Sequence, residues 1–217
     1  MQGVDPQLQA YYGLRAGYYD AVYERPERAA DIALLRQLLM GRLTGRRVLE
    51  VACGTGYWTQ HVAPVSAALV ATDATPEPLD LARQRPHAER ARFAIADAYQ
   101  LDAGLGRFDA AFAGLWLSHV PIGRRAQFLR SLHRLLEPGA RVLLFDNSQV
   151  QLRDFPIVER DAEGNTFQQR VLRDGSVHRV LKNFPGQDEL VALVAGIGTE
   201  PRYRMLENFW WFEYVLV

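Results

Sequence analysis

A glycine-rich segment is the part of this sequence whose residue types and spacing best predict chemistry. Val48 to Val51 is a short β-rich run that contains Glu50, and Cys53-Gly54-Thr55-Gly56 follows it. Residues from Tyr57 to Val62 can begin a helix. A strand, a glycine-rich turn and a helix N-terminus bring a ligand close to bare backbone, and glycine permits positive φ values and a close approach that a Cβ atom would block. The segment therefore predicts a ligand-binding loop.

The details of this loop favour one class of ligand over another. The fingerprint of dinucleotide-binding proteins has a third glycine where this sequence has Thr59. Glu50 would lie unfavourably beside a pyrophosphate, but a carboxylate suits a ligand that carries an ammonium group and no phosphate. S-adenosylmethionine is such a ligand. An NAD(P)-dependent oxidoreductase and a plain glycine turn stay open as alternatives.

The segment resembles motif I of the class I S-adenosylmethionine-dependent methyltransferases, whose pattern is Val-Leu-Glu/Asp-x-x-Cys/Gly-Gly-x-Gly. Two acids at predicted strand ends strengthen this resemblance. Asp73 closes the apolar run from Ala67 to Thr72, and the resemblance implies that it accepts hydrogen bonds from the ribose hydroxyls, with Ala74 against the adenine. Asp97-Ala98 closes the third run and is similar to the motif that binds the adenine edge. As alternatives, Asp73 caps the following helix and Asp97 is a loop acid.

The N-terminal tyrosines have two interpretations. They pack a helix onto the sheet, or they form a lid (residues 1–25) whose aromatic faces favour a sulfonium cation. The Tyr18-Tyr19-Asp20 cluster resembles an element that precedes motif I in many small-molecule methyltransferases. We expect Tyr11 and Tyr19 to contact the cofactor. The full set of predicted cofactor-binding residues is Tyr11, Tyr19, Glu50, Ala52, Gly54, Gly56, Asp73, Ala74, Asp97, Ala98 and Leu115.

The resemblance places the acceptor pocket after the fourth predicted strand, Phe108 to Ala113. His119 is the predicted general base, because histidine titrates near neutrality; a structural hydrogen-bond donor is the alternative. Trp116 and Asn147 are predicted to line the pocket with His119, and Asn165 and Gln168 are further pocket residues suggested by position alone. The Asn/Asp-Pro-Pro-Tyr sequence of enzymes that methylate planar amino groups is absent.

Apolar runs alternate with helical patterns over most of the chain, which predicts a parallel sheet covered on both faces. The resemblance implies a Rossmann-like α/β fold with a doubly wound seven-stranded sheet in the order 3-2-1-4-5-7-6. Its last strand, Phe209 to Val217, is antiparallel. It is apolar on both faces and is expected inside the sheet. Asp174-Gly175 is a turn signal for a β-hairpin insertion within residues 150–183. The whole chain, 1–217, is predicted to be one domain.

Composition limits the other function classes. The 217 residues are 48% hydrophobic, and 25 Lys+Arg balance 25 Asp+Glu, so nothing in the net charge attracts nucleic acid or a membrane surface. One cysteine, Cys53, excludes a disulfide framework and multi-thiol metal sites. No metal is predicted. We expect a cytoplasmic monomer or homodimer that needs neither a membrane nor nucleic acid as a partner.

These observations predict a methyltransferase that acts on a small molecule. An O, N or C atom of the acceptor attacks the methyl carbon in line, and S-adenosylhomocysteine leaves. Holding the reacting atoms together is the main contribution of the protein. A non-catalytic protein that binds S-adenosylmethionine or a partner is the other alternative.

Overall fold

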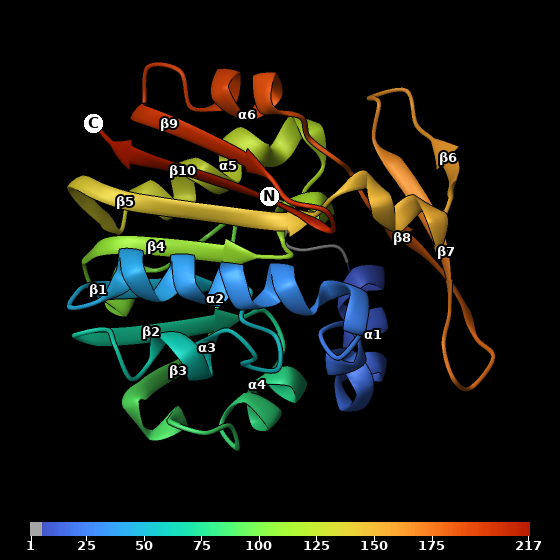
Figure 1. Cartoon of the computed structure of the whole chain (residues 1–217), viewed down its shortest axis with the longest axis horizontal. Helices are drawn as coiled ribbons and strands as arrows, with labels where there is room; N and C mark the ends of the chain where they lie inside the picture. The colour runs from blue at the N-terminus through green and yellow to red at the C-terminus, as the bar shows by residue number, and fades with distance from the viewer. Residues whose placement is uncertain (1–5) are drawn as a thin grey trace.

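The computed structural model describes residues 6–217, apart from the side chains of Leu8, Gln9, Tyr12, Ala16, Tyr18 and Tyr19. Its centre is a seven-stranded sheet in the order β3-β2-β1-β4-β5-β10-β9 (Figure 1). The strands β1 to β5 pair in parallel, and β10 is antiparallel to both β5 and β9. Since β9 and β10 are the sixth and seventh strands of this sheet, the predicted order is confirmed.

The elements have the following bounds. The sheet contains β1 (Arg47–Val51), β2 (Ala68–Asp73), β3 (Ala91–Ile95), β4 (Phe108–Gly114), β5 (Leu136–Asn147), β9 (Gly198–Met205) and β10 (Phe209–Leu216). The α-helices are α1 (Pro6–Arg15), α2 (Ala29–Leu43), α3 (Thr59–Val62), α4 (Pro76–Ala82), α5 (Arg125–His133) and α6 (Gln187–Leu193). Short 3-10 helices are η1 (Ala16–Val22), η2 (Pro26–Arg28), η3 (Ala88–Arg90), η4 (Ala103–Leu105), η5 (Leu117–His119), η6 (Ile122–Arg124) and η7 (Gln149–Arg153).

Helices cover both faces of the sheet, as parallel strands require. The helix α2 buries Ile32, Leu35, Leu39 and Leu43 on one face, where α3 and α4 also pack. The helices α5 and α6 cover the other face through residues such as Phe128. Sheet strands supply alternate residues to the two layers, so that Leu49 and Val48 lie in different core clusters.

The last strand lies inside the sheet, as its two apolar faces predict. Trp210 and Phe212 pack into one core layer, whereas Phe209 and Trp211 pack into the other. None of these four side chains is more than 3% exposed. The paired strands β5 and β9 on either side of β10 satisfy its backbone groups.

The apolar spacing of Phe128, Leu132 and Leu136 predicts a helix from Gly123 to Leu136, but the observed α5 is shorter. Leu136 is already part of β5, because it pairs with Phe108 of β4, and the strand continues through Pro138-Gly139. Pairing between β4 and β5 therefore replaces the last turn of the predicted helix. The helix that starts after motif I is also short, since α3 contains only Thr59–Val62.

The insertion after β5 is a three-stranded sheet and not the predicted hairpin alone. The expected pair is present as β7 (Thr166–Val171) and β8 (Val177–Leu181), joined through Asp174-Gly175. The additional strand β6 (Ile157–Arg160) pairs antiparallel with β7. All four of its residues are exposed, so it has no alternation of buried and exposed positions by which the sequence could reveal it.

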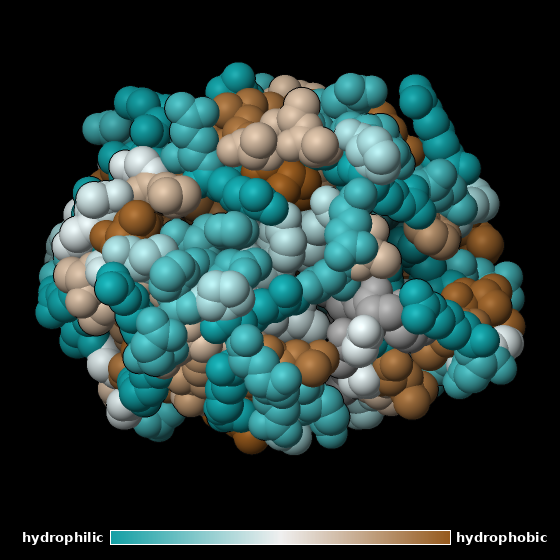
Figure 2. All heavy atoms as spheres, turned by 60° about the horizontal axis from the view of Figure 1, so that its bottom comes forward, coloured by the Kyte–Doolittle hydropathy of each residue, from teal (hydrophilic) through white to brown (hydrophobic). Residues whose placement is uncertain are grey.

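The insertion lies beside α1, beyond the carboxyl ends of the sheet strands (Figure 1). On the face in Figure 2, hydrophobic residues form separate small groups among hydrophilic ones. Among residues 6–217, no helix has the length and apolar character needed to cross a membrane.

Candidate functional site

The loop after β1 has a backbone that requires small residues. Ala52, Gly54 and Gly56 have φ values of 55°, 55° and 75°, in the left-handed region that favours glycine. A Cβ atom on Gly56 would lie 2.8 Å from the Cβ atom of Ala82 in α4, so no side chain fits there. At Gly54 nothing lies within 4 Å of such an atom. The loop thus presents open backbone at the position where the cofactor was predicted.

Asp73 connects the end of β2 to this loop. Its carboxylate accepts hydrogen bonds from the backbone N–H of Gly54 at 2.9 Å and from that of Thr75 at 3.3 Å. Burial raises the pKa of Asp73, although these hydrogen bonds oppose the increase. Each carboxylate oxygen can accept more than one hydrogen bond, so Asp73 can hold the loop and still accept from a ligand hydroxyl.

Glu50 points into the protein interior beneath the loop. It is 2% exposed, and its Oε2 accepts a hydrogen bond from Thr59 Oγ1 at 2.6 Å. Burial raises its pKa to about 8; the Thr59 hydrogen bond opposes this shift and the neighbouring Asp73 reinforces it. Thr59, which stands where a dinucleotide fingerprint has its third glycine, is therefore the partner that orients Glu50.

The residues predicted to hold the adenine lie at the neighbouring strand ends. Asp97 follows β3, and its Oδ1 accepts a hydrogen bond from the backbone N–H of Tyr99 at 2.9 Å. Ala98 is buried, whereas Ala74 is half-buried after β2. Parallel pairing of β1, β2 and β3 brings these positions and the glycine loop to one edge of the sheet.

The N-terminal segment closes over the glycine loop. In η1, Asp20 Oδ1 accepts a hydrogen bond from Thr55 Oγ1 at 2.8 Å, and Asp20 also forms an ion pair with Arg85. Arg85 Nε in turn donates to the backbone carbonyl of Thr55 at 2.9 Å. Tyr11 of α1 is 3% exposed, with its ring 5.4 Å from that of His178 in the insertion. The side chain of Tyr19 lies outside the described residues.

A cavity of about 110 Å³ opens beyond the ends of β4 and β5. It brings together Leu115, His119 and Asn147, three of the predicted site residues. Leu115 has a φ of 57° and donates its N–H to the carbonyl of Phe145. Trp116 is not among the lining residues and packs in the core near Phe128. The complete lining is Arg15, Ala21, Val22, Arg25, Arg28, Leu115, His119, Asn147, Gln151, Phe155, Arg170 and Lys182.

His119 is a weak base in this environment. Its Nδ1 lies 2.7 Å from the carbonyl oxygen of Leu181, which can only accept, so Nδ1 carries the proton in the neutral ring. Burial, together with the charge of Lys182, lowers its pKa to about 3. The ring is therefore neutral near pH 7, and it also has the structural role that was the alternative interpretation.

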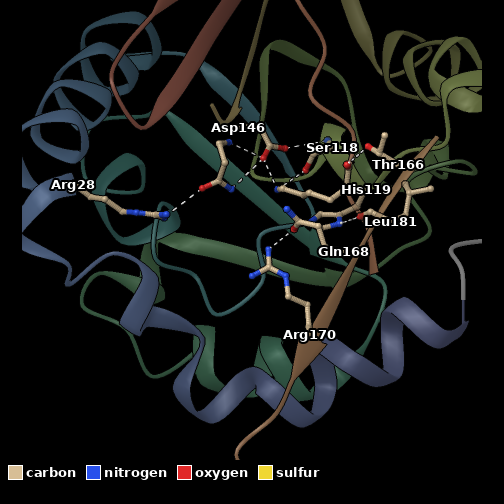
Figure 3. Close-up of polar contacts among 10 residues, drawn as sticks. Arg28, Ser118, His119, Asp146, Thr166, Gln168, Arg170 and Leu181 are labelled. Atoms are coloured by element: carbon tan, nitrogen blue, oxygen red, sulfur yellow. Dashed lines mark hydrogen bonds and ion pairs between the residues drawn. The ribbon is translucent and has the colours of Figure 1, made fainter. Parts of the chain in front are cut away.

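A buried ion pair fixes one wall of the cavity (Figure 3). Lys182, which directly follows β8, donates to Asp146 Oδ1 at 2.9 Å and to Ser118 Oγ at 2.6 Å. Asp146 also accepts from the backbone N–H groups of Ser118 and Asn147. Burial alone would raise the pKa of Asp146, but the charge and hydrogen bond of Lys182 hold it below its ordinary value. The pair thereby connects the insertion to β5 and η5.

Sequence reasoning missed this ion pair and the arginines around it. Lys182 is the only lysine in the chain, against 25 lysines and arginines together, and that rarity was an available signal. Arg28 and Arg170 carry no such signal, because the sequence contains many arginines. The expected hairpin residues have supporting roles: Gln168 accepts from Arg170, and Asn165 accepts from the backbone N–H of Ile122.

The described residues contain no group of three or more His, Cys, Asp or Glu side chains placed to hold a metal ion. The open glycine loop, the strand-end acids and the adjacent cavity instead suit an organic cofactor and a small acceptor.

Comparison with known proteins agrees with this geometry. Residues 48–139 match the model of a family described as a methyltransferase domain. The ubiquinone/menaquinone biosynthesis C-methyltransferase UbiE of Geotalea uraniireducens is 27% identical over 183 residues, covering 76% of this chain and 73% of that protein. The biotin biosynthesis bifunctional protein BioHC of Cellvibrio japonicus is 32% identical over 136 residues, which are 61% of this chain but only 26% of that protein.

A solved structure is similar over almost the full length. The DhpI–SAM–HEP complex has a TM-score of 0.80 and 27% sequence identity, and the match covers 99% of this chain and 98% of that one. The motif I loop, the sheet order and these similarities lead to one assignment. This chain belongs to the class I S-adenosylmethionine-dependent methyltransferases.

Proposed function

We propose that this chain transfers the methyl group of S-adenosylmethionine to an O, N or C atom of a small-molecule acceptor and releases S-adenosylhomocysteine. The observation that carries the proposal is the glycine loop with positive φ values at Ala52, Gly54 and Gly56, which Asp73 joins to the next strand. The similar structure named as a SAM complex supports the same cofactor.

Each predicted cofactor residue has a role in this proposal. Gly54 and Gly56 leave room for the ligand against the backbone, and Asp73 accepts from the ribose hydroxyls. Asp97 and the backbone of Ala98 bind the adenine edge. Glu50 lies beneath the loop as the acid nearest to the ammonium group, and Tyr11, Tyr19 and Leu115 enclose the cofactor. The contact of Asp20 with Thr55 supports closure of residues 1–25 as a lid.

The protein acts mainly by position. Bound S-adenosylmethionine supplies an already activated methyl group. The residues of the cavity hold the acceptor in line, and the lid excludes water. His119 remains the proposed base where an acceptor must lose a proton. Because the pKa of His119 is about 3, it can take a proton only from an acidic acceptor. An acceptor that is already deprotonated needs no base.

The partners follow from the charge balance and the size of the cavity. We propose a monomer or homodimer in the cytoplasm. It acts without nucleic acid, because basic and acidic residues are equal in number and give the chain no net positive charge. Light scattering after size-exclusion chromatography tests the oligomeric state, and a larger assembly would contradict it.

A labelled-methyl experiment tests the activity. The protein is incubated with S-adenosylmethionine carrying a CD₃ group and with a metabolite extract, and mass spectrometry then identifies compounds that have gained one CD₃. The expected result is at least one labelled compound, absent with Asp73→Ala. Asp73→Ala should weaken cofactor binding much more than His119→Ala.

Two outcomes would contradict the proposal in different ways. If the cofactor binds but no compound gains the label above the Asp73→Ala background, the chain is a non-catalytic binding protein. If Asp73→Ala and His119→Ala lose equal cofactor affinity, the roles assigned to these two residues are wrong.

A further inference from the structure

The cavity is much more basic than the chain as a whole. The formal net charge of the protein is zero, yet the cavity lining contains five cationic side chains and no aspartate or glutamate. They come from the N-terminal segment, from η2, and from the insertion: Arg15, Arg25, Arg28, Arg170 and Lys182. A concentration of like charge around one small cavity is unfavourable unless anions offset it.

Carboxylates that do not line the cavity offset two of these positive charges. Lys182 pairs with Asp146 in the interior. Arg25, at the exposed rim, pairs with Asp154 at 2.5 Å. Both pairs are complete within the protein, so neither needs an anion in the cavity.

Arg28 is a buried guanidinium whose described contacts are all neutral. It is 4% exposed, its Nη1 donates to Asn147 Oδ1 at 3.3 Å, and it lies over the Phe209 ring at 5.6 Å. None of the ion pairs among residues 6–217 involves Arg28. Burial and the charge of Arg25 lower its pKa, and the more distant charges of Asp154 and Glu27 oppose this shift only in part. An anion bound in the cavity would stabilise the positive charge of Arg28.

Arg170 approaches the same space from the insertion (Figure 3). It is 7% exposed, Nη2 donates to Gln168 Oε1 at 2.6 Å, and its guanidinium stacks over the Phe155 ring at 3.4 Å. Gln168 is itself held by a hydrogen bond to the carbonyl of Phe155. The guanidinium is thus fixed in place before any ligand binds, as a recognition residue should be.

We propose that the methyl acceptor carries a carboxylate, phosphate or phosphonate group and that Arg28 and Arg170 bind this anionic group, with Lys182 beside it. Guanidinium groups suit such oxyanions, because their planar fork donates two parallel hydrogen bonds. The two arginines come from different elements, so an anion between them joins the insertion to η2. This inference rests on the proposed function for the identity of the bound molecule as the acceptor.

The single lysine provides a direct readout. In protein labelled with ¹³C at the lysine ε-carbon, one side-chain signal reports on Lys182, which lines the cavity. S-adenosylhomocysteine is added first, and inorganic phosphate, methylphosphonate, acetate, malonate or neutral acetamide is then titrated in. We expect a saturable shift of the lysine signal with at least one anion and none with acetamide. The preferred anion distinguishes a tetrahedral phospho group from a carboxylate.

Matched variants assign the binding to the arginines. Arg28→Gln and Arg170→Gln should each weaken anion binding about tenfold or more. Arg28→Lys keeps the positive charge and should weaken anion binding less. Arg179→Gln is the control, because Arg179 lies on the same insertion but pairs with Glu159 at the surface. Circular dichroism confirms that each variant is folded, and if Arg28→Gln does not fold, Arg170→Gln carries the test.

The results separate this inference from the proposed function. If S-adenosylhomocysteine binds but no anion shifts the lysine signal, or if Arg179→Gln weakens binding as much as Arg28→Gln, the anionic acceptor is wrong and the methyltransferase proposal stands. If S-adenosylhomocysteine fails to bind while anions shift the signal, the cavity binds an anion and the proposed function fails.

Discussion

Single residues decide which ligand the glycine loop suits. Two glycines after a strand are compatible with several nucleotides, but Glu50 and Thr59 form a hydrogen-bonded pair beneath the loop. A buried carboxyl group with a pKa of about 8 is protonated near neutrality. A cation placed close to it favours the carboxylate, so binding of a ligand with an ammonium group should change its protonation.

Cofactor binding is therefore expected to release a proton from Glu50. At pH 7 we expect ~1 proton released for each S-adenosylhomocysteine bound, and none in Glu50→Gln. Calorimetry in buffers with different ionisation enthalpies measures this number from the slope of the observed enthalpy. A slope of zero in the unaltered protein, or an equal slope in Glu50→Gln, would show that Glu50 does not face the cofactor charge.

The same shift has a consequence for stability without cofactor. Because the pKa of Glu50 is raised above its ordinary value, the folded state holds a proton that the unfolded chain releases. The contribution of Glu50 to the free energy of unfolding is fully present below pH 4.5 and declines as the pH rises toward 8. The slope is at most about 1.4 kcal/mol per pH unit.

At the scale of elements, the insertion and the sheet are connected through Lys182 and Asp146. Both side chains are almost fully buried, at 2% and 0% exposure. Removing one partner leaves the other charge buried without compensation, which typically costs about 3–5 kcal/mol. We expect Lys182→Met to lower the free energy of unfolding by about this amount, as measured by urea denaturation.

The exposed pair of Arg179 and Glu159 in the same insertion is the control for this prediction. Arg179→Gln should leave the denaturation midpoint nearly unchanged, because exposed ion pairs contribute little. An equal effect of the two substitutions would mean that burial of the Lys182 pair does not determine its contribution. The low pKa of Asp146 adds a pH signature: its stabilisation is present above about pH 3.8 and is lost as pH falls through its lower folded value.

The sequence predicts elements best where one face is buried. The strands β1 to β5 and β10 are visible as apolar runs, and the apolar faces of Phe209 to Val217 place the last strand correctly inside the sheet, whereas β9 has no buried residue and no such run. The strand β6 escapes prediction because none of its side chains is buried, and its Val158 is 55% exposed. The start of β5 at Leu136 depends on pairing with Phe108, which is a long-range contact.

The glycine loop and the basic cavity also differ in how well the sequence predicts them. The glycine loop is local in sequence, since Glu50 to Thr59 lie within ten positions of one another, and Asp73 of the next strand also holds it. The basic cavity is assembled from residues in or next to α1, η1, η2, β4, η5, β5, η7, β7 and β8, so its charge is not visible until the chain is folded. His119 and Asn147 were found by position, whereas Arg28 and Arg170 have no local pattern that marks them.

At the scale of the whole molecule, a nearly neutral chain brings an open glycine loop and a basic cavity to the same edge of one sheet. Class I membership accounts for the loop, and the cavity specifies the acceptor. The distribution of charge explains how these parts cooperate: the cofactor is a cation, the cavity is cationic, and an anionic acceptor balances both.

Cofactor binding tests this account most directly. S-adenosylmethionine and NAD are titrated in turn into the protein by calorimetry, with Asp73→Asn as the matched variant that keeps the size of the side chain. The account predicts one molecule of S-adenosylmethionine per chain, affinity at least about tenfold weaker in Asp73→Asn, and no heat with NAD. Binding of NAD, or the absence of both heat and thermal stabilisation with S-adenosylmethionine, would contradict it.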